Sequence, residues 1–170
     1  FRELEGLGVP TAAAVRGQCL GGGFELALAC GRVFVAPTTS MAVPEVQLAV
    51  FPPVAAALLP WRVGGGAATD LVLTGRPVRG EEAARIGLAD HCSEDPEAAL
   101  LAWFDENLAP RSSVALRHAW RAVRRPVARA LADELDALER QYLDELMLCA
   151  DPVEGLQAFM DRRTPAWRHA

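Results

Sequence analysis

Three consecutive glycines constrain the fold of this chain more than any other feature. Gly21, Gly22 and Gly23 interrupt an apolar stretch that continues beyond them over residues 24–30. Glycine permits backbone conformations closed to other residues and lets a ligand approach the main chain closely. The pattern predicts a strand, a tight turn and a short apolar helix that Gly31 caps. The N–H groups at the start of such a helix lack intrahelical acceptors and carry partial positive charge, so the turn suits a group that holds negative charge.

Two glutamates stand in apolar surroundings. Glu25 lies in the first turn of the predicted helix, and Glu45 follows Pro44 between two apolar stretches. A buried carboxylate is costly unless it is paired or protonated, and either condition shifts its pKa. Two such carboxylates fit general acid–base catalysis. The spacing equally allows a helix-start glutamate that complements the helix dipole and an unrelated second glutamate that is paired or exposed.

The order of elements over residues 1–92 indicates an α/β fold. Residues 11–15 and 32–36 are apolar without alternation, as in strands covered on both faces. A strand–helix–strand order favours at least partly parallel pairing. We expect Pro52, Pro53 and Pro60 to break residues 46–63 into short pieces. Further elements are predicted as a helix ending before Gly8, an extended piece over 40–43, helices over 67–73 and 80–86, and a strand over 88–92.

Residues 93–170 are predicted to be all-helical. Asp95 is an N-cap followed by proline at the first helical position, and Ser112 or Ser113 caps the next helix. Pro126 is expected to end or kink that helix. Asp151 and Glu154 match a capping box at the start of the last helix. Apolar side chains recur at helical spacing over residues 128–149.

Composition excludes several classes of function. The net charge of −5 gives no bulk attraction to nucleic acid, and all 17 basic residues are arginine, which reflects compositional bias. The arginines between residues 111 and 129 predict a basic helix face. This face is solvated, forms a subunit contact or binds a phosphorylated ligand, and the acidic stretch 133–145 could neutralise it. Four widely spaced cysteines predict no zinc site and no disulfide framework, which favours a cytoplasmic setting. No apolar run is long enough to span a membrane, and the absence of an initiator Met suggests part of a longer polypeptide.

Four segments, in order, resemble the crotonase, or enoyl-CoA hydratase/isomerase, superfamily. The resemblance implies an α/β fold of ββα spiral units without the family's N-terminal part, followed by a helical tail. Residues 1–92 would be the partial core, and residues 93–170 the region of oligomerisation and coenzyme A contact. The segments are VRGQCLGGGFELALAC, MAVPEVQLAVFP, LVLTGRPVRGEEAARIGLA and DPVEGLQAFMDRR.

The resemblance also implies a site. The Gly22 N–H would be one of two donors to a thioester oxygen, with Gly21 beside it. Glu25 and Glu45 would hold a water and exchange protons with it and with the α-carbon. The remaining substrate contacts would be Phe51 and Pro53 near the acyl group and Phe159 and Arg162 near coenzyme A. The ligand would be an acyl-CoA thioester, with no metal, no further cofactor and no nucleic acid or membrane partner, and the assembly a trimer or a dimer of trimers.

Departures from the family pattern narrow the implied activity. The segment bearing the second oxyanion donor is absent, and the alternatives are a second chain, cleavage of a longer chain, or a sequence that leaves this segment out. Pro53, which has no N–H, stands where a glycine N–H helps hold the water. The stretches VRGQCLGGG and VFPPVAAALLP are most similar to the cyclohexa-1,5-diene-1-carbonyl-CoA hydratase branch. The implied function is hydration of an unsaturated, cyclic dienoyl thioester. The alternatives are an ordinary enoyl-CoA hydratase, an enoyl-CoA isomerase and a non-catalytic assembly module.

Overall fold

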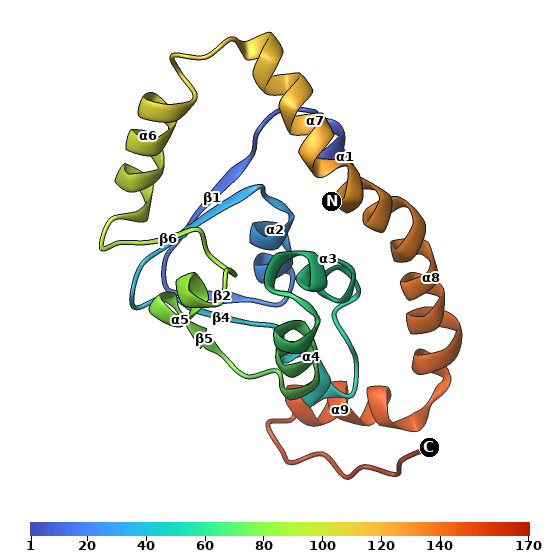
Figure 1. The fold of residues 1–170 in the computed structure, drawn as a ribbon. Coiled ribbons are helices and arrows are strands. Elements are labelled where there is room, and N and C mark those ends of the chain that lie inside the picture. Colours follow the sequence, from blue (N-terminus) through green and yellow to red (C-terminus); the bar gives the residue numbers. More distant parts are fainter.

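Six strands form two three-stranded sheets in the computed structural model, which describes residues 1–170 (Figure 1). The first sheet has the order β1-β3-β6 and the second the order β2-β4-β5. Strand β1 pairs in parallel with β3, and β2 in parallel with β4, while β5 runs antiparallel to β4. The first four strands thus alternate between the sheets, whereas β5 follows β4 in the second sheet and β6 returns to the first. The strands are β1 (Ala12–Val15), β2 (Gln18–Leu20), β3 (Arg32–Val35), β4 (Ser40–Ala42), β5 (Val78–Arg79) and β6 (His91–Cys92).

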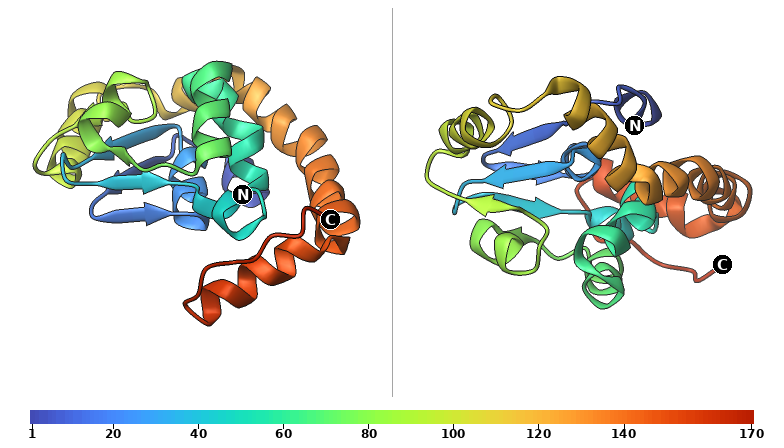
Figure 2. Two further views of the ribbon diagram at one scale, coloured as in Figure 1. Left: turned by 90° about the horizontal axis from the view of Figure 1, so that it is seen from below. Right: turned by 45° about the horizontal axis from the view of Figure 1, so that its top comes forward.

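Helices cover these sheets and then run around them as a long arm (Figures 1 and 2). The core helices are α1 (Arg2–Gly6), α2 (Gly22–Ala29), the 3₁₀ turn η1 (Pro44–Leu48), α3 (Pro53–Val63), α4 (Gly65–Thr74) and α5 (Gly80–Arg85). The arm comprises α6 (Pro96–Asn107), α7 (Ser113–Arg129), the π-helical η2 (Ala130–Glu134), α8 (Leu135–Arg140), the π-helical η3 (Gln141–Glu145), the 3₁₀ turn η4 (Leu146–Leu148) and α9 (Ala150–Met160). None of these helices is both long and apolar enough to cross a membrane.

The strands expected over residues 11–15, 32–36 and 40–43 are confirmed as β1, β3 and β4. The strand predicted before the glycines is confirmed as β2, which is separate from β1 because a turn at Gly17 sends the chain from one sheet to the other. One strand, β5, was not expected. Strand β5 is only two residues long, too short to show any periodicity.

Two expected helix ends are wrong. Pro60 lies within the single helix α3, and Pro126 lies within α7 and does not end it; that Pro126 kinks α7 stays a prediction. Proline removes one N–H and leaves the carbonyl four residues earlier without its donor. Both prolines are exposed. Because residues four apart share a helix face, the unpaired carbonyl lies on the side nearest water, which lowers the cost of continuing the helix.

The middle of the arm packs into the hydrophobic core. Leu131 and Leu135 join the same buried cluster as Phe24 of α2 and Leu59 of α3. Burying each such side chain contributes about 1.5–3 kcal/mol. These contacts fix the position of the residues that follow Leu135 on α8 and η3.

Arg124 ties α7 to the end of α2. Its guanidinium pairs with Glu5 at 2.5 Å and donates to the carbonyl of Ala29 at 2.7 Å. The expected neutralisation of the arginine run by the acidic stretch 133–145 is wrong, because Arg124 turns inward to α1 and Asp136 pairs with Arg2 instead. The arginine thereby satisfies a carbonyl that helix ends leave without a donor.

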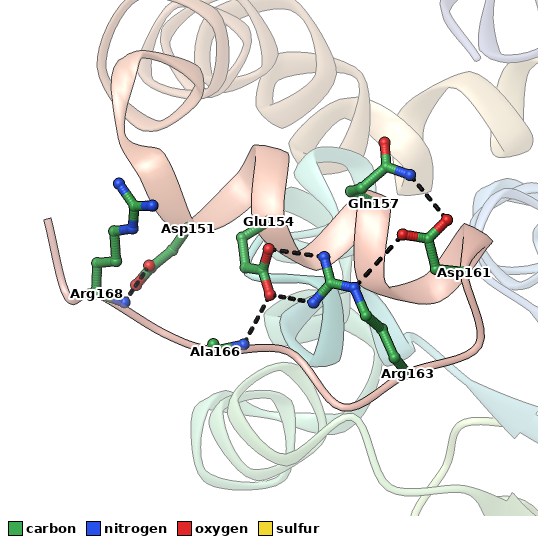
Figure 3. A network of polar contacts seen from close by, with 7 residues as sticks. All are labelled: Asp151, Glu154, Gln157, Asp161, Arg163, Ala166 and Arg168. Atoms are coloured by element: carbon green, nitrogen blue, oxygen red, sulfur yellow. Dashed lines mark hydrogen bonds and ion pairs between the residues drawn. The ribbon is translucent and has the colours of Figure 1, made fainter.

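The capping box expected at the last helix is also wrong. The α9 N-cap is Cys149, and the two acidic residues hold the C-terminal segment instead (Figure 3). Glu154 accepts from Arg163 at 2.6 and 2.9 Å and from the Ala166 N–H at 2.7 Å, while Asp151 accepts from the N–H groups of Arg168 and His169. The Arg163 guanidinium lowers the pKa of Glu154 to about 2.

Helix α9 packs against the turn that bears Glu45. A Cβ on Gly155 would lie 2.3 Å from the Leu48 carbonyl oxygen in η1, which is closer than any side chain allows. Glycine at this position therefore permits direct backbone contact between α9 and η1. This contact links the end of the arm to one of the two candidate catalytic glutamates.

Candidate active site

The start of α2 exposes free backbone donors. Gly21 is the N-cap, with φ +54° and ψ −127°, a conformation that L side chains rarely adopt. Its own N–H donates to the Ala42 carbonyl of β4 at 3.0 Å. Gly22 and Gly23 follow as the first helical residues and are exposed. Their N–H groups have no acceptor within the helix, so they are available to an anionic ligand atom.

The side chain of Glu25 caps the neighbouring helix α3. Glu25 is buried, and its Oε1 accepts from the Ala55 N–H at 2.9 Å. The α3 N-cap is Pro52, which has no side-chain acceptor to offer the first helical N–H groups. Glu25 supplies that acceptor from α2, so the carboxylate is held in place by backbone.

Opposing effects act on the proton affinity of Glu25. Burial raises its pKa and has the largest effect, while the hydrogen bond from Ala55 lowers it and the charge of Glu45 raises it. The net result is a pKa above the ordinary glutamate value. A raised pKa brings a carboxyl group closer to the range in which it can both accept and return a proton.

Glu45 lies against the α2 glycine turn. Its Oε1 is 3.0 Å from the point where a Cβ on Gly21 would stand, so glycine leaves the room for this carboxylate. Its Oε2 is buried and has no hydrogen-bond partner. Burial raises the pKa of this carboxyl group as well. An unpartnered buried oxygen is costly, and it is the kind of acceptor that a bound water or substrate would satisfy.

One cavity of about 260 Å³ joins the two glutamates. Of the residues expected at the acyl group, Phe51 and Pro53 line it together with Glu25 and Glu45. Gly21 adjoins it through its contact with Glu45, and Gly22 is the next residue along the chain but does not line it. Its volume is below the roughly 300–1,000 Å³ of pockets that hold drug-sized ligands, so it suits the reacting end of a ligand alone.

The arm closes this cavity with three residues that the sequence did not identify. They lie on α8 and η3, and Tyr142 packs edge-on against Phe51 with ring centroids 5.5 Å apart. Tyr142 could have been singled out from the sequence because it is the only tyrosine in the chain. The three residues are Glu139, Tyr142 and Leu143.

Phe159 and Arg162 lie outside this cavity. Phe159 lies near the end of α9 and is 68% exposed, and Arg162, two residues beyond the end of α9, is also exposed. Within one chain they do not meet the glutamates. Their contact with coenzyme A, in the same or a neighbouring subunit, therefore stays a prediction, as does the division of the chain at residue 92.

A larger cavity does not suit the expected chemistry. It measures about 650 Å³ and lies among β1, α6 and α7, with Trp103, Phe104 and Trp120 in its walls. Its charged residues are all arginines, and no carboxylate faces it. No group of three His, Cys, Asp or Glu side chains in the structure is placed to hold a metal ion. The two-glutamate cavity is therefore the candidate active site.

Glu45→Gln is expected to stabilise the protein at neutral and higher pH. The folded-state pKa of Glu45 lies above its unfolded value, so the folded state binds this proton more tightly. The stability that this carboxyl group contributes is present at low pH and is lost as pH rises through the folded pKa. Glutamine has no proton to lose, so the melting temperature of the variant should exceed that of the parent at about pH 8 and approach it at about pH 4. A variant less stable than the parent at high pH would contradict this account of Glu45.

The sequence of this chain was compared with those of known protein families. The family model described as enoyl-CoA hydratase/isomerase matches residues 1–170. The chain belongs to the enoyl-CoA hydratase/isomerase family. The expected resemblance is thereby confirmed, and so is the crotonase-type α/β fold with its helical tail.

Individual relatives cover the whole of this chain but exceed it in length. Cyclohexa-1,5-dienecarbonyl-CoA hydratase of Thauera aromatica is 48% identical over 168 residues, which are 99% of this chain and 65% of that protein. Carnitinyl-CoA dehydratase of Proteus mirabilis is 33% identical over 175 residues, covering 98% of this chain and 66% of that protein. The chain thus spans about two thirds of the length of these relatives.

Solved structures share the fold. An enoyl-CoA hydratase from Mycobacterium avium superposes with a TM-score of 0.85 at 26% identity, over 96% of this chain and 67% of that one. A carnitinyl-CoA hydratase from the same organism gives a TM-score of 0.84 at 30% identity, over 95% and 63%. The arrangement of two sheets and a helical arm is therefore that of known family members.

Proposed function

We propose that the protein containing this chain adds water to an unsaturated acyl-CoA thioester, and that its preferred acyl group is a cyclic diene. The observation that carries the proposal is the meeting of the buried Glu25 and the half-buried Glu45, whose carboxyl groups both have a raised pKa, in one cavity beside Gly21. The 48% identity to a cyclohexa-1,5-dienecarbonyl-CoA hydratase supports the choice of acyl group.

The chemistry follows from these groups. The thioester oxygen accepts the Gly22 N–H, which stabilises the negative charge that develops on that oxygen as an enolate forms. One glutamate takes a proton from the water while the water oxygen bonds to the β-carbon. The other glutamate gives a proton to the α-carbon, so the net change is addition of one water. Because the Gly22 N–H binds this oxygen more tightly in the enolate than in the ground-state thioester, it lowers the barrier to enolate formation.

The two glutamates differ in their hydrogen bonds. Glu25 is fixed by the Ala55 N–H, whereas the Oε2 of Glu45 has no partner in the chain. Water placed between them can donate one hydrogen bond to each carboxyl group. The small cavity, with Phe51, Pro52 and Pro53 as rigid walls, favours a compact acyl group. Pro52 is fully buried and cannot move aside for a longer one.

Turnover of paired substrates tests the proposal. The complete protein is incubated with cyclohexa-1,5-diene-1-carbonyl-CoA and, separately, with crotonyl-CoA, and the products are separated and identified. We expect a hydrated product from the cyclic thioester and a higher kcat/KM for it than for crotonyl-CoA. Preference for crotonyl-CoA would instead favour an ordinary enoyl-CoA hydratase, and a product of unchanged mass would favour an isomerase. Absence of any turnover would favour the assembly module.

A further inference from the structure

The arm brings one hydrogen-bond donor to the two-glutamate cavity. Eight residues line this cavity: three glutamates, two prolines, a phenylalanine, a leucine and Tyr142. Ionised carboxylates only accept hydrogen bonds, and the apolar side chains do neither. The Tyr142 hydroxyl is therefore the only side-chain donor in the cavity wall apart from the glutamate that carries the proton for the α-carbon.

The backbone of residues 52–55, which adjoins the cavity, offers no free hydrogen-bond donor in place of the Tyr142 hydroxyl. Pro52 and Pro53 have no N–H. The N–H groups of Val54 and Ala55 both interact with the carboxylate of Glu25. A water in this cavity would thus find acceptors in the glutamates, but no backbone donor on this wall.

The position of Tyr142 is fixed from two sides. Its ring meets the ring of Phe51 at 66°, an edge-to-face contact of the kind that aromatic pairs prefer. Upstream, Leu131 and Leu135 anchor the arm in the core, and α8 packs on α3. Tyr142 itself lies in η3, a π-helical turn, and such turns occur frequently at functional sites.

We propose that the Tyr142 hydroxyl positions the attacking water by donating a hydrogen bond to its oxygen. The water donates one hydrogen bond to the ionised glutamate that takes its proton and one to the carbonyl oxygen of the protonated glutamate, whose proton goes to the α-carbon. The water oxygen has two lone pairs. One lone pair forms the bond to the β-carbon, and the other accepts from Tyr142. This inference rests on the proposed hydration and adds a third group that fixes the water, taken from the helical arm.

Tyr142→Phe in the complete protein tests the inference. The variant keeps the ring that contacts Phe51 and loses only the hydroxyl. We expect kcat for hydration to fall on the order of 10- to 100-fold, with KM within about twofold of the parent. Gln141→Ala, one residue away on the exposed side of η3 and outside the cavity, is the matched control and should keep parental kcat.

A second measurement separates a positioning role from a structural one. Exchange of the α-proton of a saturated acyl-CoA in D₂O needs a glutamate and the Gly22 N–H but no attacking water. Tyr142→Phe should therefore retain parental exchange while it loses hydration. Equal loss of both activities, or parental hydration by Tyr142→Phe, would overturn the inference. If the parent hydrates no acyl-CoA at all, the proposed function itself fails, and that outcome is distinct because the variant then has no activity to lose.

Discussion

Glu25→Gln and Glu45→Gln each reduce hydration of the thioester by about 10²- to 10⁴-fold, the range that general acid–base groups contribute. Glutamine keeps the size of the side chain and an oxygen that can accept the Ala55 N–H in place of Glu25. It cannot take or return a proton at the pH of the assay. Because both carboxyl groups exchange protons with the same water and substrate, the double variant should be scarcely less active than either single one.

Steady-state kinetics on the complete protein measures this loss. Glu106→Gln, on the exposed end of α6 and outside the cavity, is the matched control for the change of charge. Its kcat/KM should equal that of the parent. Near-parental activity in Glu25→Gln or in Glu45→Gln would show that the reaction does not use both carboxyl groups, and the two-glutamate mechanism would be abandoned.

Gly22→Pro is expected to lower kcat by about 10²- to 10³-fold, as does loss of one oxyanion donor in other enzymes. Gly22 is the first residue of α2, and proline is favoured at this position because its missing N–H has no helical partner. The substitution therefore removes one donor while leaving the helix intact. The lost donor acts on charge that develops only in the transition state, so KM should change little.

Gly22→Ala controls for the added side chain. A Cβ at this position would meet nothing within 4 Å, and alanine keeps the N–H. Its kcat should stay close to that of the parent, and the melting temperatures of the two variants should agree. If Gly22→Pro kept parental kcat, the oxyanion would have to be held by other groups.

The sequence predicted the start of a helix well where a capping residue marks it. Asp95 caps α6 through its side chain, which accepts from the Ala98 N–H, and Ser112 caps α7 in the same way. Both are local interactions between residues three apart, so the sequence alone reveals them. The helix ends expected at Pro60 and Pro126 were wrong because the cost of a proline within a helix depends on whether the carbonyl left without a donor faces water. That depends on burial, which a sequence alone does not give.

Long-range pairing accounts for what the sequence could not show at the site. The two glutamates could be identified as unusual from their apolar neighbours, but their meeting in one cavity depends on β2 and β4 pairing in parallel. Tyr142 reaches the cavity only because the arm folds back about a hundred residues later. Glu154 and Asp151 matched a capping motif locally, yet they bind the chain end beyond α9. In each case a tertiary contact outweighs the local pattern.

Incorporation of oxygen-18 tests the central claim most directly. The complete protein is incubated with the cyclic dienoyl-CoA in H₂¹⁸O, and the product is analysed by mass spectrometry. We expect one oxygen-18 atom on the β-carbon of the product with the parent protein, and about 10²- to 10⁴-fold less labelled product in the same time with Glu25→Gln or Glu45→Gln. An unlabelled product of unchanged mass from the parent, or full labelling by either glutamine variant, would contradict the account.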